Sequence, residues 1–355
     1  MIFTLANKAS SMISNQTSTV EQTFLPKVSV IIPVFNGERD LPELIDCLYK
    51  QSYPQELVEY LLVDNNSSDR TAQIVQAAAK EAVSKRISIH YLSENKIQSS
   101  YAARNAGIRF SSGEIICFTD VDCRPEADWV AALIKPFAES CVMVVGGAIA
   151  ALSGITLMEK YAERKNLLSH KASLSHYFCP YGQTANLAVR RQALEKVGLF
   201  RPYLTTGGDA DICWRIQQKS SCTIRCAEKA VVRHRHRKTL RGLLKQWKRY
   251  GKSHQYLSQL YQIERKNDAF WNRKQYFLCW RDWLLHQFPR LSIRVIFRKA
   301  TLLDLLTRPI DLLTIQARIS EKRKTKLPEQ AYQIEWLSQS QNKLEVNKDI
   351  SLKVP

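Results

Sequence analysis

The sequence predicts an α/β protein in which helices flank a mostly parallel β-sheet. Between residues 28 and 150, short apolar runs alternate with helical patterns, and this order is typical of βαβ units. Polar side chains gather directly after three of the apolar runs, at the strand ends where such sheets bind ligands. The chain of 355 residues is 45% hydrophobic, enough for one large domain with an appendage or for two modest domains.

The first elements show this alternation. Residues 28–32 are predicted to form a buried strand that Pro33 ends. Asp40 is expected to cap the next helix, with Pro42 in its first turn and Glu43 completing a capping box. The later elements follow the same patterns, with strands expected at 58–63, 87–92, 114–119 and 141–150 and helices at 69–83, 99–110 and 126–139.

A strand that ends in two acids is the most informative feature of the chain. The buried run from Glu114 leads to Asp120 and Asp122, and side chains two residues apart on an extended segment point the same way. Two close carboxylates repel unless a positive charge lies between them. Mg²⁺ or Mn²⁺ bound to a substrate diphosphate meets that need. The alternative is a solvated turn with two surface acids.

A second acidic element lies further along the chain. A loop and strand are predicted at 182–191 and a helix at 192–197, after which Gly207 and Gly208 precede Asp209 and an apolar helical pattern. On its own, Asp209 could simply cap that helix. No GxGxxG follows the first strand and no GxxxxGK[ST] occurs, which argues against a dinucleotide fold and a P-loop ATPase.

Positive charge is concentrated in the C-terminal part. Residues 233–330 hold 24 Lys and Arg against 7 Asp and Glu, whereas the remaining residues hold 28 against 26. This basic segment, interleaved with aromatic residues, fits helices in the interface of an anionic membrane. The alternative is a helical subdomain that packs on the core with its charges in solvent.

Several features bear on the compartment. No run of about 18 uncharged apolar residues occurs, so no spanning helix is expected. The first residues lack the pattern of a signal peptide, and the nine cysteines are scattered. Cys222 and Cys226 are close, but no other cysteine or histidine lies at zinc-site spacing. We therefore expect reduced thiols and a cytoplasmic protein, peripheral on the cytoplasmic face of the membrane.

Five sequence elements together resemble the family 2 glycosyltransferases, which have the GT-A fold. In family order they are residues 30–36, 63–69, 103–105, 120–122 and 208–212. The resemblance covers about residues 28–250. The expected organisation is a flexible tail at 1–27, a GT-A domain at 28–240, a basic amphipathic helical segment at 241–330 and a C-terminal tail at 331–355.

The resemblance implies a nucleotide-sugar site. Asp64 would accept the N3–H of a uracil, Arg104 would approach a phosphate, and Asp120 would contact ribose or metal-bound water. Asp122 would bind Mn²⁺ or Mg²⁺ directly. The full nucleotide-sugar set carried over is Pro33, Val34, Asn36, Glu38, Asp64, Asn65, Arg104 and Asp120.

The resemblance also implies the catalytic base. Asp209 matches the aspartate of the family's Glu-Asp motif, which is the general base in inverting members. Gly208 stands where the motif has its glutamate, so the second acid is missing. Asp211 is the fallback base.

Two further matches begin the basic segment. His234 stands where many GT-A enzymes place a metal-binding histidine, although it could be a basic-loop histidine beside His236. Residues 246–250 resemble the QxxRW acceptor motif, with tyrosine in place of tryptophan, or are simply part of an amphipathic basic helix. The acceptor residues implied are Gly208, Gln246, Arg249 and Tyr250.

The expected function is therefore a metal-dependent, inverting transfer of sugar from a nucleotide-sugar, in first place a UDP-sugar, to a hydroxyl of a glycan or lipid acceptor. A nucleotidyltransferase of similar fold and an inactive glycosyltransferase-like scaffold are the closest alternatives. A basic nucleic-acid-binding protein is a third, but it leaves the carboxylates of Asp64, Asp120, Asp122 and Asp209 unexplained. No nucleic-acid partner is therefore expected.

Overall fold

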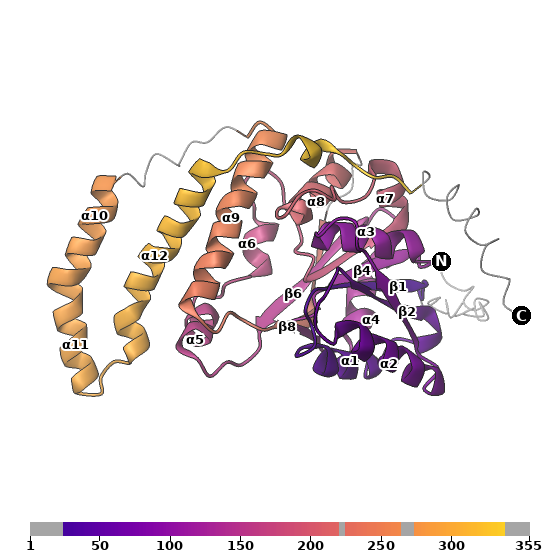
Figure 1. Ribbon diagram of the computed structural model, residues 1–355, viewed down its shortest axis with the longest axis horizontal. Coiled ribbons are helices and arrows are strands. Elements are labelled where there is room, and N and C mark those ends of the chain that lie inside the picture. The colour runs from indigo at the N-terminus through magenta and orange to yellow at the C-terminus, as the bar shows by residue number, and fades with distance from the viewer. Residues whose placement is uncertain (1–23, 220–223, 264–272, 338–355) are drawn as a thin grey trace, which may run out of the picture.

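The computed structural model describes residues 24–219, 224–263 and 273–337. Within these ranges a curved sheet lies between two layers of helices, and a group of C-terminal helices extends from one side (Figure 1). The strands are β1 (Val28–Val34), β2 (Val58–Asp64), β3 (Ser88–Ser93), β4 (Ile115–Thr119), β5 (Cys123–Pro125), β6 (Val144–Ala151), β7 (Asn186–Arg190) and β8 (Ile224–His234).

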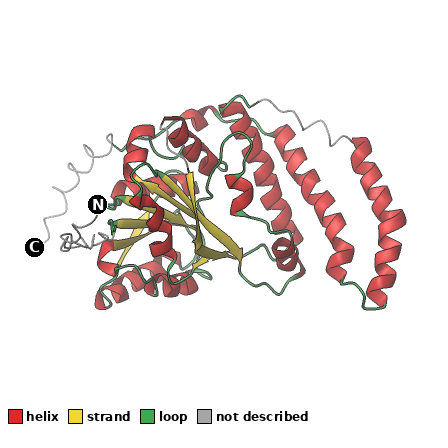
Figure 2. Ribbon diagram, turned by 180° about the vertical axis from the view of Figure 1, so that it is seen from behind, coloured by secondary structure: helices red, strands yellow, loops and turns green. Residues whose placement is uncertain are grey.

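Helices occupy both faces of this sheet and the C-terminal region (Figure 2). The α-helices are α1 (Leu41–Tyr49), α2 (Thr71–Ser84), α3 (Ser100–Phe110), α4 (Trp129–Ile134), α5 (Leu157–Arg164), α6 (His170–Leu174), α7 (Arg191–Val197), α8 (Gly208–Lys219), α9 (Leu240–Leu260), α10 (Arg273–Asp282), α11 (Phe288–Ile296) and α12 (Leu302–Lys324). Shorter helical turns are η1 (Gln55–Leu57), η2 (Lys135–Ala138), the π-helical η4 (Trp283–Gln287) and η5 (Glu329–Tyr332).

The sheet confirms the predicted α/β class and adds an antiparallel insertion. Its strand order is β3-β2-β1-β4-β7-β6-β8-β5. β3, β2, β1 and β4 are parallel, whereas β7 is antiparallel to both of its neighbours and β5 is antiparallel to β8. The carboxyl ends of β1, β2 and β4 therefore meet at one edge.

Burial on both faces explains the apolar runs. All seven residues of β1 and of β2 are buried, as is usual for parallel strands with helices on each side. Alternate residues enter opposite cores. Val30 packs in the core that includes Leu41 of α1 and Trp129 of α4, whereas Ile31 packs with Ile108 of α3 and Trp214 of α8.

Two local predictions at the start of the chain were wrong. β1 does not end at Pro33 but continues to Val34. Its pairing with β4 stops at Ile31, so one edge of the strand is free beyond that point and tolerates a residue without an amide hydrogen. Asp40 makes no capping bond to α1, because its carboxylate and that of Glu43 pair with arginines instead. By contrast, α3 lies where a helix was expected, and the Ser99 side chain caps it by accepting from the Tyr101 amide.

The C-terminal region contains an inner pair of helices next to the core and one outer helix. α9 and α12 lie side by side next to the core (Figure 1). A Cβ at Gly251 of α9 would lie 2.1 Å from the Arg318 carbonyl oxygen, so only glycine permits this approach. α10, η4 and α11 run end to end as one continuous outer helix over residues 273–296, which we call the α10–α11 helix, and this helix lies beside α12 (Figure 1). In the part of the chain that the structure describes, no helix combines the length and apolar content needed to cross a bilayer.

Residues at the inner ends of both predicted tails contact the core. Residues 328–337, the C-terminal strap, cross back over the core (Figure 1). The Leu199 amide donates to the Glu335 carbonyl at 2.8 Å, and Asn105 Nδ2 donates to the Glu335 carboxylate at 3.0 Å. At the other end, Tyr53 donates to the Pro26 carbonyl at 2.7 Å. Residues 1–23 and 338–355 of the predicted tails lie outside the described residues.

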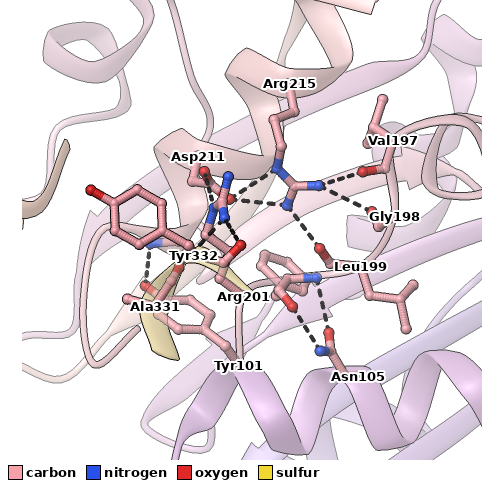
Figure 3. Close-up of polar contacts among 12 residues, drawn as sticks. Tyr101, Asn105, Val197, Gly198, Leu199, Arg201, Asp211, Arg215, Ala331 and Tyr332 are labelled. Carbon is pink, nitrogen blue, oxygen red and sulfur yellow. Dashed lines mark hydrogen bonds and ion pairs between the residues drawn. The ribbon is translucent and has the colours of Figure 1, made fainter. Parts of the chain in front are cut away.

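A buried ionic cluster joins these parts (Figure 3). The Asp211 carboxylate is fully buried between Arg201 and Arg215, with N–O distances of 2.9 and 3.0 Å. Arg215 also donates to the Val197 and Leu199 carbonyls, and Arg201 donates to the Tyr332 carbonyl of the strap. One carboxylate therefore fixes α8, the loop after α7 and the strap together.

Replacing Asp211 with Asn should destabilise the protein strongly. The change leaves two guanidinium groups without their counter-charge, which should lower the free energy of unfolding by about 3 kcal/mol. Urea unfolding followed by tryptophan fluorescence measures the change. The control is Asp46→Asn, which breaks an exposed pair with Lys50 and should cost no more than about 0.5 kcal/mol. Equal effects of the two substitutions would contradict the role of the cluster.

Candidate functional site

A cavity of about 620 Å³ opens beyond the carboxyl ends of β1 and β4. Its size lies within the range of small-molecule sites. Most of the residues predicted from the sequence line it: Pro33, Val34 and Asn65 from the sheet edge, Arg104 from α3, Asp120 and Asp122 after β4, Asp209 from α8, His234 from the end of β8, and Gln246, Arg249 and Tyr250 from α9.

Asp122 and His234 form a metal-type pair in this cavity. Antiparallel pairing of β5 with β8 places Cys123 opposite His234, and the His234 Nε2 atom lies 3.3 Å from Asp122 Oδ1. Cys123 completes a cluster whose ligand atoms lie within 4.8 Å of one another. Burial, followed by the charge of Asp122, raises the pKa of the Cys123 thiol well above its usual value, so this thiol stays protonated. A carboxylate with an imidazole fits a divalent ion such as Mn²⁺.

Four charged side chains form ion pairs next to Asp122 and His234. Arg124 binds the carboxylates of Asp40 and Glu43 at 2.7 and 2.8 Å, and Arg235 binds the same two at 2.9 Å each. The hydrogen bond from Arg124 is the main cause that lowers the pKa of Glu43. Since Arg124 follows Cys123 and Arg235 follows His234, the four charges fix β5 and β8 against α1.

Asp120 has a different partner from Asp122. Its Oδ1 atom accepts a 2.6 Å hydrogen bond from Arg104 Nη2. The Arg104 side chain is buried, and its Nε atom has no hydrogen-bond partner among the residues that the structure describes. Asp122 instead faces His234 and Arg237, whose Nη1 lies 3.7 Å away. Asp120 and Asp122 thus have different cationic neighbours.

Asp209 is held in the cavity wall by side chains, not used as a cap. It lies inside the first turn of α8, so its interpretation as an N-cap was wrong. Its carboxylate accepts hydrogen bonds from Tyr101 Oη at 3.1 Å, from Thr184 Oγ1 at 3.1 Å and from the Thr184 amide at 3.3 Å. These bonds aim the carboxylate while leaving it at the cavity surface.

Tyr101 also explains the glycine at position 208. A Cβ on Gly208 would lie 2.7 Å from the Tyr101 ring, and the Gly208 amide donates to Tyr101 Oη at 2.9 Å. The ring therefore occupies the space that a glutamate at this position would need. Sequence analysis missed Tyr101 and Thr184. Tyr101 stands one helical turn before Arg104 on α3, and that spacing was the available signal.

Some predicted residues take other positions. Asn36, Glu38 and Asp64 are not among the residues that line the cavity. Asn36 Oδ1 accepts from the Ser68 amide, Glu38 Oε2 from the Arg70 amide, and Asp64 from the Ser67 amide and Tyr91. They organise the loops after β1 and β2. Asp211, the fallback base, is buried in the ionic cluster (Figure 3) and does not reach the cavity.

The helix α9 forms the opposite wall. Gln246 Nε2 donates to Tyr250 Oη at 2.8 Å, and the Trp247 and Tyr250 rings meet edge to face. Burial raises the pKa of Tyr250, so its hydroxyl stays protonated. The helix with the QxxRW-like pattern is thus part of the cavity, although its role in acceptor binding stays a prediction.

The chain matches known glycosyltransferases in sequence. Residues 29–198 match the model of glycosyl transferase family 2, and residues 130–313 match that of glycosyl transferase family group 2. Glycosyltransferase AglE of Haloferax volcanii is 37% identical over 187 residues, 52% of this chain and 59% of that protein. An undecaprenyl-phosphate 4-deoxy-4-formamido-L-arabinose transferase of Yersinia enterocolitica is 31% identical over 169 residues, 45% of this chain and 49% of that protein. The match thus spans about half the length of these relatives.

A solved structure has the same fold. The mannosyltransferase PcManGT from Pyrobaculum calidifontis, in complex with GDP-Man and Mn²⁺, superposes with a TM-score of 0.54 over 94% of this chain and 82% of that one, at 18% identity. Since the family group 2 model also spans more than half of the chain, this GT-A protein belongs to the family 2 glycosyltransferases.

Proposed function

We propose that this protein transfers a sugar from a nucleotide-sugar to an acceptor hydroxyl by one inverting displacement. The observation that carries the proposal is that one cavity contains both the Asp122–His234 pair and the braced carboxylate of Asp209. A single displacement needs a base on the acceptor side and charge stabilisation on the leaving-group side. In this proposal Asp209 is the base, and a cation on the Asp122–His234 pair stabilises the charge.

Asp209 is the proposed general base. Its carboxylate would take the proton from the acceptor hydroxyl as that oxygen attacks the anomeric carbon. The hydrogen bonds from Tyr101 and Thr184 orient the carboxylate toward the cavity. Both partners are neutral donors, so neither forms a salt bridge that would compete for the Asp209 carboxylate.

The leaving diphosphate lies, in this proposal, between the strand edge and α9. Asp122 and His234 would hold a divalent cation, Mn²⁺ in first place or Mg²⁺, which supplies Lewis-acid stabilisation of the diphosphate. Arg104, Arg237 and Arg249 also line this part of the cavity. Guanidinium groups at these positions can bind phosphate oxygens. The proposed donor is a UDP-sugar, although the solved neighbour contains GDP-Man.

The acceptor is proposed to be a glycan or a lipid-linked molecule, bound near Gly208, Gln246, Arg249 and Tyr250. The name of the Yersinia relative, a transferase to undecaprenyl phosphate, supports a lipid acceptor. A protein that uses such acceptors works beside a membrane, and the α10–α11 helix offers a surface for one.

The α10–α11 helix combines exposed apolar and cationic side chains. Seven large apolar residues in this helix or at its C-terminal end are exposed, namely Phe277, Leu284, Leu285, Phe288, Ile293, Ile296 and Phe297. Residues 274–300 contain six Lys and Arg and one acid, Asp282. We place this helix on the anionic cytoplasmic face of a membrane, with apolar side chains inserted and cations among the headgroups.

Substitution of Asp209 by Asn should reduce turnover at least about 100-fold, because the amide cannot accept the acceptor proton. UDP release from a UDP-sugar with Mn²⁺ and a verified acceptor measures this. Thermal unfolding should stay close to that of the unmodified protein, and Asp46→Asn should keep full activity. Undiminished turnover in Asp209→Asn would reject the base assignment.

Substitution of Asp122 by Ala should abolish the Mn²⁺-dependent stabilisation by UDP. A nucleotide at 100 times its Kd stabilises the folded state by about 2.7 kcal/mol, which a thermal-shift measurement detects. Asp120→Asn is the matched comparison, since it should weaken UDP binding while keeping the response to Mn²⁺. If Asp122→Ala kept that response and Asp120→Asn lost it, the roles of the two acids would be reversed.

The double substitution Ile296→Ser and Phe297→Ser should weaken binding to anionic vesicles at least about tenfold, because each large apolar side chain contributes more than about 1 kcal/mol on insertion. Co-sedimentation with phosphatidylserine vesicles measures it. The control is Val83→Ser with Phe110→Ser, which removes exposed apolar side chains of α2 and α3. Equal binding of both double variants would contradict the α10–α11 helix as the membrane contact.

A further inference from the structure

A second cluster of metal-ligand side chains lies outside the residues that line the cavity. His170 at the start of α6 approaches Cys226 and Glu228 of β8, and one ligand atom of each residue lies within 4.8 Å of the others. We call these three residues the β8 cluster. The two contributing segments are far apart in the sequence, so only the fold brings the imidazole to the thiol and the carboxylate.

The strand side of this cluster is rigid. Cys226 pairs in register with Gly146 of β6, and β8 bulges between Ala227 and Val231. The buried Asn186 side chain fixes the bulge, since its Nδ2 donates to the Ala148 carbonyl at 2.7 Å and to the Ala230 carbonyl at 2.8 Å. The indole of Trp129 donates to Asn186 Oδ1 at 2.8 Å. The backbone on both sides of Glu228 is therefore held in place.

On the helix side of the cluster, the imidazole of His170 is shielded from solvent but makes no hydrogen bond in the described structure. This is true of both ring nitrogens, Nδ1 and Nε2. A buried polar atom without a partner costs free energy. A neutral imidazole resolves this cost when one ring nitrogen binds a metal ion.

We propose that the β8 cluster binds Zn²⁺ through the His170 imidazole, the Cys226 thiolate and the Glu228 carboxylate. The thiol would release its proton to solvent as the ion binds. Histidine, thiolate and carboxylate are the ligands that Zn²⁺ takes in proteins, and solvent would fill the fourth position. The thiolate makes this site softer than the Asp122–His234 pair, which suits Mn²⁺.

A bound zinc ion would fix one wall of the catalytic cavity. α6 is only five residues long, and Ser169, Ala172 and Ser173 around His170 line the cavity. A metal bond from His170 to β8 would hold these residues against the sheet. The site would thus set the position of a segment that contacts the substrates, without taking part in the transfer.

Cobalt spectroscopy of the full chain tests the site independently of glycosyl transfer. Stoichiometric Co²⁺ added to the reduced, metal-free protein should produce the sulfur-to-cobalt charge-transfer band of thiolate ligation, and Zn²⁺ should remove it by displacement. The Cys226→Ser and His170→Gln variants should each lose the band. Zn²⁺ should also raise the Tm of the unmodified protein but not that of Cys226→Ser.

Two cysteine controls make the test specific. Cys123→Ser removes the thiol beside Asp122, and Cys141→Ser removes another exposed thiol; both variants should keep the band. The proposal is overturned if the unmodified protein gives no band, or if the band persists in Cys226→Ser or in His170→Gln. Loss of the band in Cys123→Ser alone would assign the thiolate to the other cluster and also overturn it.

Discussion

The buried carboxylate of Asp211 is the interaction on which the catalytic geometry depends. Two guanidinium groups neutralise it, and the donors they have left over bind backbone carbonyls of the loop after α7 and of the strap. Tyr261 at the end of α9 donates to the same carboxylate at 2.9 Å. The first turn of α8 is thereby fixed relative to both walls of the cavity. Asp209 lies in that turn, so the contacts of Asp211 also fix the position of the proposed base.

The same division between a structural and an accessible acid recurs at the strand end. Asp120 is paired with Arg104, whereas Asp122 faces a histidine and a half-exposed arginine. In each pair of acids, spaced two residues apart, a strong arginine contact takes one carboxylate and leaves the other for chemistry. This arrangement lessens the repulsion between neighbouring carboxylates, because a cationic side chain lies beside Asp120, Asp122 and Asp211, while neutral donors hold Asp209.

The sequence predicted those features of the structure that are determined by residues close together in the chain. The strands followed from the buried apolar runs, and the place of Asp120 and Asp122 followed from the common edge of parallel strands, whereas Asp209 was expected only from the family resemblance. The capping box at Asp40 failed because arginines distant in sequence compete for its carboxylate. Likewise, the Tyr101 ring that excludes a side chain at Gly208, and the approach of His170 to Cys226, arise only from tertiary packing. No spacing rule reports such contacts.

The C-terminal strap has a consequence for how the protein reaches its native state. The carboxylate of Glu335 binds Asn105 and Arg109 of α3, and the Tyr332 carbonyl binds Arg201 beside the ionic cluster. Chains are synthesised from the amino end, and their early parts begin to fold first. The sheet can therefore form during translation. The strap residues that contact α3 and the ionic cluster around Asp211 follow the basic helices in the chain, so these contacts form only after those helices have left the ribosome. Assembly of this cavity is thus a late event in the biogenesis of the protein.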